Sequence, residues 1–313
     1  MRVSILIAIF VLAALTGVAS CASMNATQTA PPIGTFLDVG GQSLHVVDLG
    51  PKDSVRSPVI LIHGASVNLR DIKLALGDRL ASDHRVILID RPGRGYSTRS
   101  DDGWKLATQA ELIKGAADLL GAEKPVIVGQ SFGGAVALRY ALDYEADISG
   151  LVLLAPVSHE WPAGIAWYNN VSGWPVAGFL LRRLIIPTYG QLAAKGSVKK
   201  SFAPDAPPPN YFEKSGLALL FRPHDFKANA ADIANLKTQI AAQQELYVTL
   251  TLPTAIVTGA SDATVSPDIH SKRLAVEIEQ ASLTLLPNTG HALHHSQTDA
   301  IAEIIRSMTG SKT

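Results

Sequence analysis

The chain contains little cysteine and little charge of either sign, and both shortages exclude classes of protein. Cys21 is the single cysteine among 313 residues, so an intramolecular disulfide is excluded. Charged residues make up 17% of the chain, with 27 basic against 27 acidic residues, and the basic ones form no block. A nucleic-acid-binding protein would need a basic face, so that class is not expected. The 47% of hydrophobic residues predicts a large core in a globular protein of one or two domains.

The N-terminal apolar run is too short to span a bilayer comfortably. Arg2 precedes this run over residues 3–15, and small residues follow as far as Cys21. This order of parts is typical of a secretory signal peptide, here over residues 1–20. The segment VASC, which ends at Cys21, resembles the lipobox of bacterial lipoproteins, in which the cysteine is acylated and becomes the N-terminus. A plain secretory signal cleaved near Ala22 is the alternative.

Acylation of Cys21 would make residues 21–32 a connection between lipid and domain. The sequence after the cysteine, ASMNATQTAPP, is small, polar and proline-ended, which predicts a flexible tether. The protein is then expected to be an exported, membrane-anchored lipoprotein on the extracytoplasmic side of a bacterial cell envelope. Ala22 is not the aspartate associated with inner-membrane retention, which favours the outer membrane where the source has one.

Apolar segments alternate with helical ones from residue 33 onward. Two alternating stretches joined at Gly40 and Gly41 predict a β-hairpin. Continuously apolar segments predict buried strands at residues 58–62, 85–89, 125–128, 151–154, 254–257 and 282–286. Helices are predicted at residues 69–81, 105–120, 132–144, 268–279 and 292–308. This alternation predicts an α/β fold with a mostly parallel central sheet and helices on both faces.

One interval interrupts the alternation. Residues 157–252 contain helical patterns but no strand of the same kind, and a structureless loop of that length is implausible in a compact domain. We therefore predict a core formed by residues 33–156 and 253–313, with residues 157–252 inserted as a helical cap. The interval contains Trp161, Trp167 and Trp174, which are expected to bury the cap on the core, the commoner fate of such residues.

Ser131 stands at the centre of the most informative motif. It lies in the string Gly129-Gln130-Ser131-Phe132-Gly133, where a predicted strand turns sharply into a predicted helix. A bulky side chain two positions away on either side would collide across such a turn, which glycine avoids. The turn lifts the hydroxyl above the strand ends and sets the next backbone N–H beside it, at the positive end of the helix dipole. A serine N-cap on an ordinary helix is the alternative.

Two further strand ends carry residues that could activate this serine. The strand at 254–257 leads to Asp262, and the strand at 282–286 leads to His291 just before the last helix. A serine hydroxyl needs an imidazole to take its proton, and a carboxylate fixes the imidazole tautomer. Asp225 or Asp232 could replace Asp262, and His294 or His295 could replace His291. The first two lie inside the cap, and the other two lie one turn into the helix.

The strand ends at residues 62 and 89 carry weaker motifs. The segment HGAS at 63–66 follows the first, where the N–H of Ala65 could join that of Phe132 in an oxyanion hole. His63 itself is expected to be structural. The segment DRPGRGYS at 90–97 follows the second, but it has neither the P-loop nor the dinucleotide-binding glycine spacing, so nucleotide binding is not expected.

Taken in order, HGAS, DRPGRGYS, GQSFGG, GASDATVSP and GHALHH resemble the α/β-hydrolase family, in its capped subgroup of esterases, lipases, C–C bond hydrolases and haloperoxidase-like enzymes. The resemblance covers residues 33–310. It implies a catalytic triad of Ser131, Asp262 and His291, with oxyanion donors at Ala65 and Phe132. The dehalogenase and epoxide hydrolase branches use an aspartate nucleophile where this chain has a serine, so those activities are not expected.

These observations predict a serine hydrolase that needs no cofactor and no metal. Ser131 would attack an ester-like carbonyl of a small apolar substrate. Cleavage of a C–C bond in a diketone-like acid by the same triad is an alternative. A binding protein that has the fold without turnover is another, since fold does not fix function.

Overall fold

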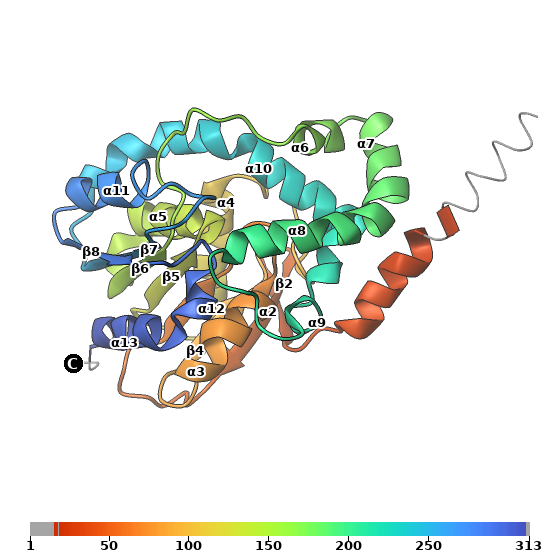
Figure 1. Cartoon of the computed structure of the whole chain (residues 1–313). Helices are drawn as coiled ribbons and strands as arrows, with labels where there is room; N and C mark the ends of the chain where they lie inside the picture. The colour runs from red at the N-terminus through yellow and green to blue at the C-terminus, as the bar shows by residue number, and fades with distance from the viewer. Residues whose placement is uncertain (1–15, 18, 311–313) are drawn as a thin grey trace, which may run out of the picture.

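The computed structural model describes residues 16–17 and 19–310 of the chain (Figure 1). Most of the predicted signal peptide therefore lies outside the described residues. Within that part of the chain, no helix combines the length and the apolar character needed to span a bilayer.

The central element is an eight-stranded sheet in the order β1-β2-β4-β3-β5-β6-β7-β8. β1 and β2 form the predicted hairpin, β2 also pairs antiparallel with β4, and the remaining pairs are parallel. This arrangement confirms the predicted α/β class and the mostly parallel sheet. The strands are β1 (Thr35–Val39), β2 (Gln42–Leu49), β3 (Val59–Ile62), β4 (Val86–Ile89), β5 (Val126–Gln130), β6 (Gly150–Leu154), β7 (Thr254–Gly259) and β8 (Ala281–Leu286).

Side chains that alternate along each central strand enter two separate cores, one on each face of the sheet. Ile60 and Ile62 of β3 belong to the core beneath α4 (Leu106–Leu119) and α5 (Phe132–Tyr144). Val59 and Leu61 belong to the core beneath the helical stretch α2 (Leu69–Ile72), η1 (Lys73–Gly77) and α3 (Asp78–Leu80), together with α13 (Thr298–Met308). Both faces are covered, which is why the parallel strands are continuously apolar.

Shorter helices complete the core. η2 (Glu145–Asp147) follows α5, and α11 (Ser271–Glu277) lies between β7 and β8. The helix predicted at 292–308 is divided into α12 (Leu293–Ser296) and α13, because Gln297 leaves the helical conformation and the Thr298 hydroxyl donates to the carbonyl oxygen of His294 at 2.8 Å. The break gives α12 its own direction, which matters for the two histidines it carries.

Helices fill the interval between β6 and β7 and lie over the carboxyl ends of the strands (Figure 1). They include a small core of their own, to which Leu181, Phe202 and Phe221 belong. The helices are α6 (Trp167–Ser172), α7 (Ala177–Leu180), η3 (Leu181–Gly190), α8 (Gln191–Phe202), α9 (Tyr211–Lys214), η4 (Leu217–Phe221), α10 (Pro223–Gln243) and η5 (Gln244–Thr249).

The division into a core and a cap of residues 157–252 stays a prediction, but α10 packs in both layers. α10 begins in the cap, but Leu236 and Ile240 in its second half are buried in the main core beside α5. A helix of 21 residues is long enough to belong to both layers. α10 therefore packs against both the cap helices and the main core.

The prediction that the cap tryptophans are buried is wrong for two of the three. Trp167 is 66% exposed and Trp174 is 57% exposed, whereas Trp161 is half-buried. The cap core is filled by phenylalanine and aliphatic side chains instead.

The segment predicted as a flexible tether is also different in the structure. Residues 19–29 are helical, and Ala26 and Ala30 are buried. The Tyr96 hydroxyl donates to the carbonyl oxygen of Ala30 at 2.6 Å, and the Arg70 guanidinium donates to that of Pro31. The small residues that suggested flexibility instead let this N-terminal helix pack closely.

Candidate active site

Ser131 lies between β5 and α5 in a strained turn. Its φ of +54° and ψ of −117° fall outside the regions that side chains ordinarily adopt. A Cβ on Gly129 would lie 2.4 Å from the carbonyl oxygen of Gly133, and a Cβ on Gly133 would lie 2.3 Å from that of Ile62. Both glycines are therefore required for the turn to form against β3.

The structure brings the three side chains predicted at the strand ends into one hydrogen-bonded chain. Nδ1 of His291 lies 2.7 Å from Oδ2 of Asp262. Nε2 of His291 lies 3.0 Å from the hydroxyl oxygen of Ser131. With Nδ1–H donating to the carboxylate, Nε2 is left as an acceptor facing the serine hydroxyl.

The Asp262 carboxylate is fixed on its other side by the backbone. Its Oδ1 accepts from the N–H of Thr264 at 2.7 Å and of Val265 at 2.9 Å, and its side chain is fully buried. The loop after β7 thus points one carboxylate oxygen at His291 and holds the other in place. These two backbone hydrogen bonds fix the orientation of the carboxylate that faces the imidazole, as the partner of a catalytic base requires.

The alternative acids and bases lie elsewhere. Asp232 pairs with Arg91 at 2.8 Å, and Asp225 with Arg222 at 2.6 Å. Both aspartates therefore connect α10 to arginines and not to His291. Nε2 of both His294 and His295 lies within 2.9 Å of the Asp71 carboxylate, so neither ring is directed at Ser131.

The backbone after β3 passes directly over Ser131. A Cβ on Gly64 would lie 2.2 Å from the Gln130 side-chain oxygen and 3.3 Å from the Ser131 Cβ, so a larger residue here would displace the Gln130 side chain and crowd Ser131. Ala65 follows and lines the cavity beside Ser131. Phe132 is the first residue of α5, where backbone N–H groups lack acceptors within the helix. Both proposed oxyanion donors therefore lie next to the serine.

Asn229 and Arg91 hold this turn, a role that the sequence did not indicate for either residue. Ser66, with a φ of +62°, donates its N–H to the side-chain oxygen of Asn229 at 2.7 Å. Arg91 donates to the carbonyl oxygens of His63 and Gly64, both at 3.1 Å, and its guanidinium lies 4.3 Å from the centre of the Phe132 ring. No local pattern indicates these roles, because they depend on contacts between distant segments.

His63 is structural, as predicted from the sequence. Its Nδ1 lies 2.9 Å from the carbonyl oxygen of Gly64, and its Nε2 accepts from the N–H of Arg91 at 3.1 Å. Burial, together with the charges of Arg91 and Arg94, holds the pKa of His63 well below its usual value. A neutral imidazole is what this pattern of one donor and one acceptor requires.

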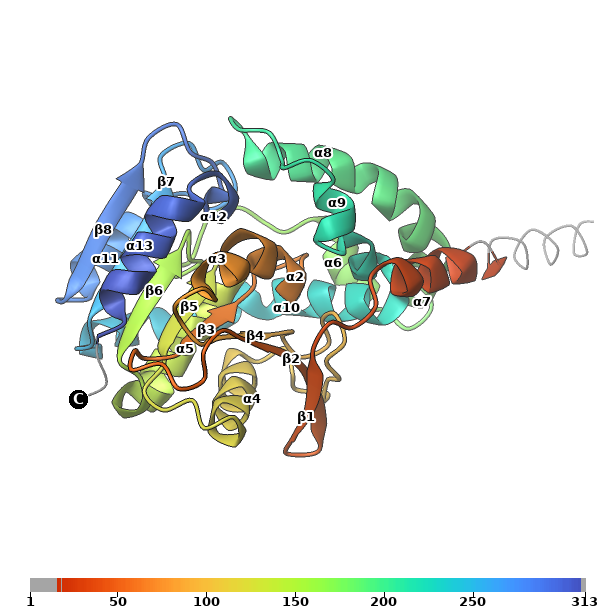
Figure 2. The ribbon, with the colours of Figure 1, turned by 90° about the horizontal axis from the view of Figure 1, so that it is seen from below.

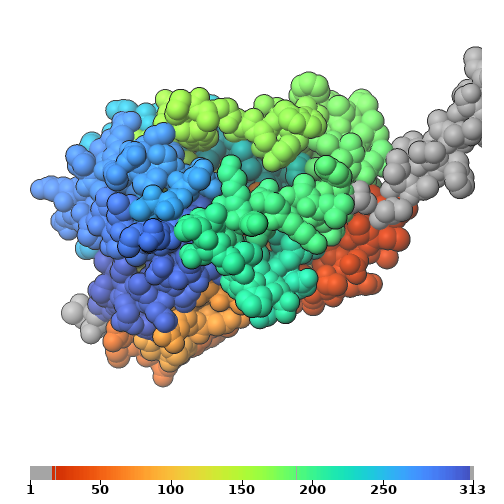
Figure 3. All heavy atoms as spheres, viewed as in Figure 1, coloured from red at the N-terminus to blue at the C-terminus, as the bar shows by residue number. Residues whose placement is uncertain are grey.

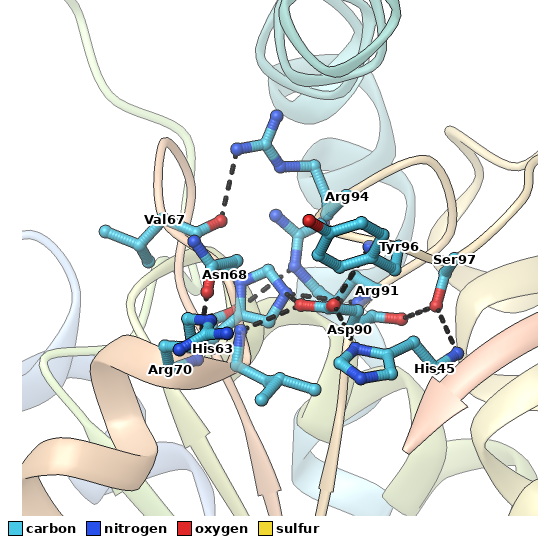
Figure 4. A network of polar contacts seen from close by, with 12 residues as sticks. His45, His63, Val67, Asn68, Arg70, Asp90, Arg91, Arg94, Tyr96 and Ser97 are labelled. Atoms are coloured by element: carbon cyan, nitrogen blue, oxygen red, sulfur yellow. Dashed lines mark hydrogen bonds and ion pairs between the residues drawn. The ribbon is translucent and has the colours of Figure 1, made fainter. Parts of the chain in front are cut away.

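Asp90 is the centre of the polar network shown in Figure 4. Its carboxylate accepts from the N–H groups of Leu69 and Tyr96 at 2.8 and 3.0 Å and lies 2.7 Å from Nδ1 of His45. A Cβ on Gly95 would lie 2.0 Å from this carboxylate. The glycine-rich segment 90–97 is therefore folded around a carboxylate of its own and leaves no cradle for a phosphate.

A cavity of about 330 Å³ lies over Ser131 and His291. No lysine or arginine is present among the described residues that line this cavity. Its walls are mainly apolar, supplied by the cap and the loop after β3: Val67, Val198, Phe202, Leu217, Leu220 and Ile233.

One wall of the cavity is polar and was not expected from the sequence. Asp71 accepts from the Tyr211 hydroxyl at 2.6 Å and lies within 2.9 Å of the Nε2 atoms of His294 and His295. Burial would raise the pKa of Asp71, but the charges and hydrogen bonds of the two histidines hold it well below its usual value. Burial lowers the pKa of His294.

Asp71, His294 and His295 present ligand atoms within 4.8 Å of one another, which is a spacing a metal ion could use. Both Nε2 atoms are already at hydrogen-bond distance from the carboxylate, however, and the Tyr211 hydroxyl donates to it as well. The cluster is complete as a hydrogen-bonded group, and its clearest effect is to attach α12 and α9 to α2.

Comparison with known proteins shows a match to the model of the alpha/beta hydrolase family over residues 59–304. A 2-hydroxymuconate semialdehyde hydrolase from Pseudomonas putida is 28% identical over 297 residues, which cover 90% of this chain and 96% of that one. Haloalkane dehalogenase 2 from Mycobacterium tuberculosis is also 28% identical, covering 86% of this chain and 92% of that one.

Solved structures show the same fold. An esterase from Exiguobacterium antarcticum superposes with a TM-score of 0.70 at 22% identity, covering 88% of this chain and 98% of that one. A meta-cleavage product hydrolase from Pseudomonas fluorescens superposes with a TM-score of 0.61 at 24% identity, covering 88% and 97%.

Proposed function

We propose that this chain, which belongs to the alpha/beta hydrolase family, is a serine hydrolase that cleaves an ester-like bond of a small apolar substrate through an acyl-enzyme. The observation that carries the proposal is the position of His291, between the Asp262 carboxylate at 2.7 Å and the Ser131 hydroxyl at 3.0 Å. That geometry gives the serine a base within reach and gives the base a fixed tautomer.

The residues would act in two half-reactions. Ser131 Oγ attacks the carbonyl carbon as His291 Nε2 takes the hydroxyl proton. The bond between the carbonyl carbon and the leaving-group oxygen then breaks, and His291 returns the proton to the departing alcohol. A water molecule, deprotonated by His291, attacks the acyl-enzyme, and the acid leaves as Ser131 regains its proton.

The backbone N–H groups of Ala65 and Phe132 would stabilise the negative oxygen of each tetrahedral intermediate. Donors that are fixed before the reaction begins stabilise this charge without reorganising. The approach of Gly64 to Ser131, the Asn229 hydrogen bond to Ser66 and the Arg91 hydrogen bonds to His63 and Gly64 all support a rigid turn at this point.

The cavity favours a neutral substrate. A diketone-like acid, the substrate class of the alternative C–C bond hydrolase, carries a carboxylate that needs a cationic or strongly donating partner. Among the described lining residues there is no lysine or arginine, whereas the walls are apolar and Asp71 adds a negative charge. A haloalkane is disfavoured for a different reason, since the proposed nucleophile is Ser131 and not an aspartate.

Labelling with a fluorophosphonate tests whether the protein has an activated serine nucleophile. We expect a covalent adduct on Ser131, located by peptide mass spectrometry, and no adduct in Ser131→Ala. An unlabelled but folded wild-type chain would favour the binding-protein alternative. A panel of esters of increasing acyl length, compared with a diketone acid, then separates the two hydrolase classes: faster cleavage of the diketone acid would contradict the ester assignment.

For the location of the enzyme, we propose a lipoprotein acylated on Cys21. The support is the sequence VASC and the exposed position of the Cys21 side chain on the N-terminal helix. Mass spectrometry of the mature N-terminus is the test, with an acylated Cys21 as the expected result. An N-terminus beyond residue 21, or an unmodified Cys21, would contradict the proposal and leave a plain secreted protein.

A further inference from the structure

The cap carries an outward apolar surface that nothing in the described structure covers. Nine of the 19 large hydrophobic side chains that are exposed among the described residues lie between residues 167 and 192. The most prominent are Trp167, Trp174, Val176, Phe179, Tyr189 and Leu192. Their exposed fractions range from 50% for Phe179 to 73% for Val176. So many exposed apolar side chains in one segment of a globular protein point to an interaction site.

This segment is apolar on two faces. Leu181 and Ile186 of η3 are buried in the cap core, while Phe179, Tyr189 and Leu192 point away from it and are exposed. A helix that contacts only water on its outer side normally presents polar residues there. The outer residues are therefore suited to a second apolar environment.

The charge of the segment identifies that environment. Residues 161–204 contain five basic residues, Arg182, Arg183, Lys195, Lys199 and Lys200, and no acidic residue, although the whole chain is neutral. Tryptophan and tyrosine beside lysine and arginine are the composition of segments that lie in a membrane interface with anionic headgroups.

The N-terminal helix lies at the same end of the molecule. Figures 1 and 2 show residues 19–29 and α7 at the end opposite to β8, and Figure 3 shows the cap residues (green) and the N-terminal helix (red) together at that end. The helix is held in place by Tyr96 and by α10, since Arg222 at the start of α10 lies 3.5 Å from the Thr27 hydroxyl. A chain attached to a membrane by its N-terminus would therefore hold the cap close to that membrane.

We propose that the surface formed by residues 167–192, which we term the cap apolar surface, docks on a lipid bilayer that contains anionic headgroups. The aromatic and aliphatic side chains would enter the interfacial layer, and the lysines and arginines would contact the headgroups. The cavity over Ser131 is lined by Ala194 and Val198 of α8, the helix that also carries Leu192, so docking would bring apolar substrates in the bilayer close to it. The docking itself does not depend on the proposed hydrolysis.

Quenching of tryptophan fluorescence by brominated lipid tests docking even when the N-terminus already holds the chain on the membrane. The full chain is bound to vesicles of brominated phosphatidylcholine and phosphatidylglycerol, and binding is verified by flotation. We expect the emission to be quenched relative to unbrominated vesicles, and most of the quenching to disappear in Trp167→Phe/Trp174→Phe. Trp104 and Trp161 supply the unquenched remainder.

A second variant keeps the tryptophans and removes the neighbouring apolar side chains. In Val176→Ser/Phe179→Ser/Leu192→Ser we expect quenching to be lost, whereas Leu119→Ser/Val276→Ser, exposed outside the cap, should be quenched like the wild type. Lys195→Gln/Lys199→Gln/Lys200→Gln should reduce quenching on the anionic vesicles, by weakening docking roughly fivefold per lysine removed.

Two results would overturn the proposal. One is a vesicle-bound wild-type chain whose emission brominated lipid does not quench. The other is equal quenching in the cap variant and the wild type. If quenching is absent and the cap variant instead converts a dimer into a monomer in sedimentation without lipid, the cap apolar surface binds a second copy of the chain and not a bilayer.

Discussion

Ser131 holds a backbone conformation that few residues with a side chain adopt, and the glycines around it are the reason it can. Strain of this kind is retained where the surrounding structure enforces it and commonly marks a functional residue. The strain belongs to the turn and not to the hydroxyl, because any residue with a Cβ would experience it at this φ.

Replacing Ser131 with alanine should therefore remove activity without unfolding the protein. We expect kcat to fall by roughly four to six orders of magnitude, as for other triad nucleophiles. The midpoint of thermal unfolding should stay close to that of the wild type, since the buried contacts of the turn are unchanged. A Ser131→Ala variant that folds and hydrolyses esters at nearly the wild-type rate would exclude Ser131 as the nucleophile.

Alanine variants of His291, His294 and His295 should differ clearly in how much activity and stability each one loses. His291→Ala should reduce kcat/KM by several orders of magnitude, because it removes the proposed base. His294→Ala and His295→Ala should affect kcat/KM far less, since both rings face Asp71. Each should instead lower the free energy of unfolding by about 2 kcal/mol through the loss of a hydrogen bond to a buried charge.

Ester kinetics and urea unfolding of the three variants measure these two effects separately. If His294→Ala or His295→Ala caused the larger loss of kcat/KM, the base would have been assigned to the wrong residue.

At the scale of elements, α10 connects the cap, the core and the turn over Ser131. Its first half carries Asp225 and Asp232, which pair with buried arginines of the loop after β4. Asn229 holds Ser66, and the second half of the helix is part of the main core. Removing one partner of an ion pair this deeply buried strongly destabilises a protein, because the other charge is left buried without a partner. These pairs therefore hold α10 firmly in place.

Asn229→Ala should lower kcat because it releases the turn that positions the Ala65 N–H. We expect a loss on the order of 10- to 100-fold in kcat, less than the removal of an oxyanion donor, with little change in KM. Asn235→Ala is the matched control, since its side-chain amide donates within α10, to the carbonyl oxygen of Ala231. Equal kcat values for the two variants would show that Asn229 does not position the turn.

At the scale of the whole molecule, buried histidines should make the fold sensitive to acid. Burial lowers the pKa of His63 and of His294, and burial together with the charge of His159 lowers the pKa of His270 to about 4. In the unfolded chain each titrates at about 6.5. Between these values the unfolded state binds more protons than the folded state, so stability falls as the pH decreases.

Urea unfolding measured between pH 7 and pH 4.5 should show this decrease. His270 alone contributes up to about 3 kcal/mol across its full window, because each pKa unit corresponds to about 1.4 kcal/mol. The N–H groups of Ser158 and His159 donate to Nδ1 of His270. The side-chain oxygen of a glutamine can accept the same hydrogen bonds, but glutamine does not titrate. His270→Gln should therefore flatten the pH dependence of the free energy of unfolding. An unchanged slope in this variant would mean that His270 already takes up its proton in the folded state near pH 6.5.

The sequence by itself determined the α/β class, the strands and the turn at Ser131. Each of these depends on a pattern within about ten residues: strand periodicity, helix periodicity, or the exclusion of side chains from a tight turn. The order of the strand ends along the chain, together with the resemblance to the α/β-hydrolase family, predicted which three side chains would meet, because the carboxyl ends of parallel strands share one edge of the sheet.

Only the tertiary structure decided the rest, because those features depend on contacts between distant residues. Asp71 meets His294 across 223 positions, and Ser66 meets Asn229 across 163. The helical tether, the packing of α10 in both layers and the exposure of Trp167 and Trp174 likewise follow from which neighbours the folded chain supplies. A residue's type and local spacing say that a side chain can be buried or hydrogen-bonded, but packing determines whether a partner is there.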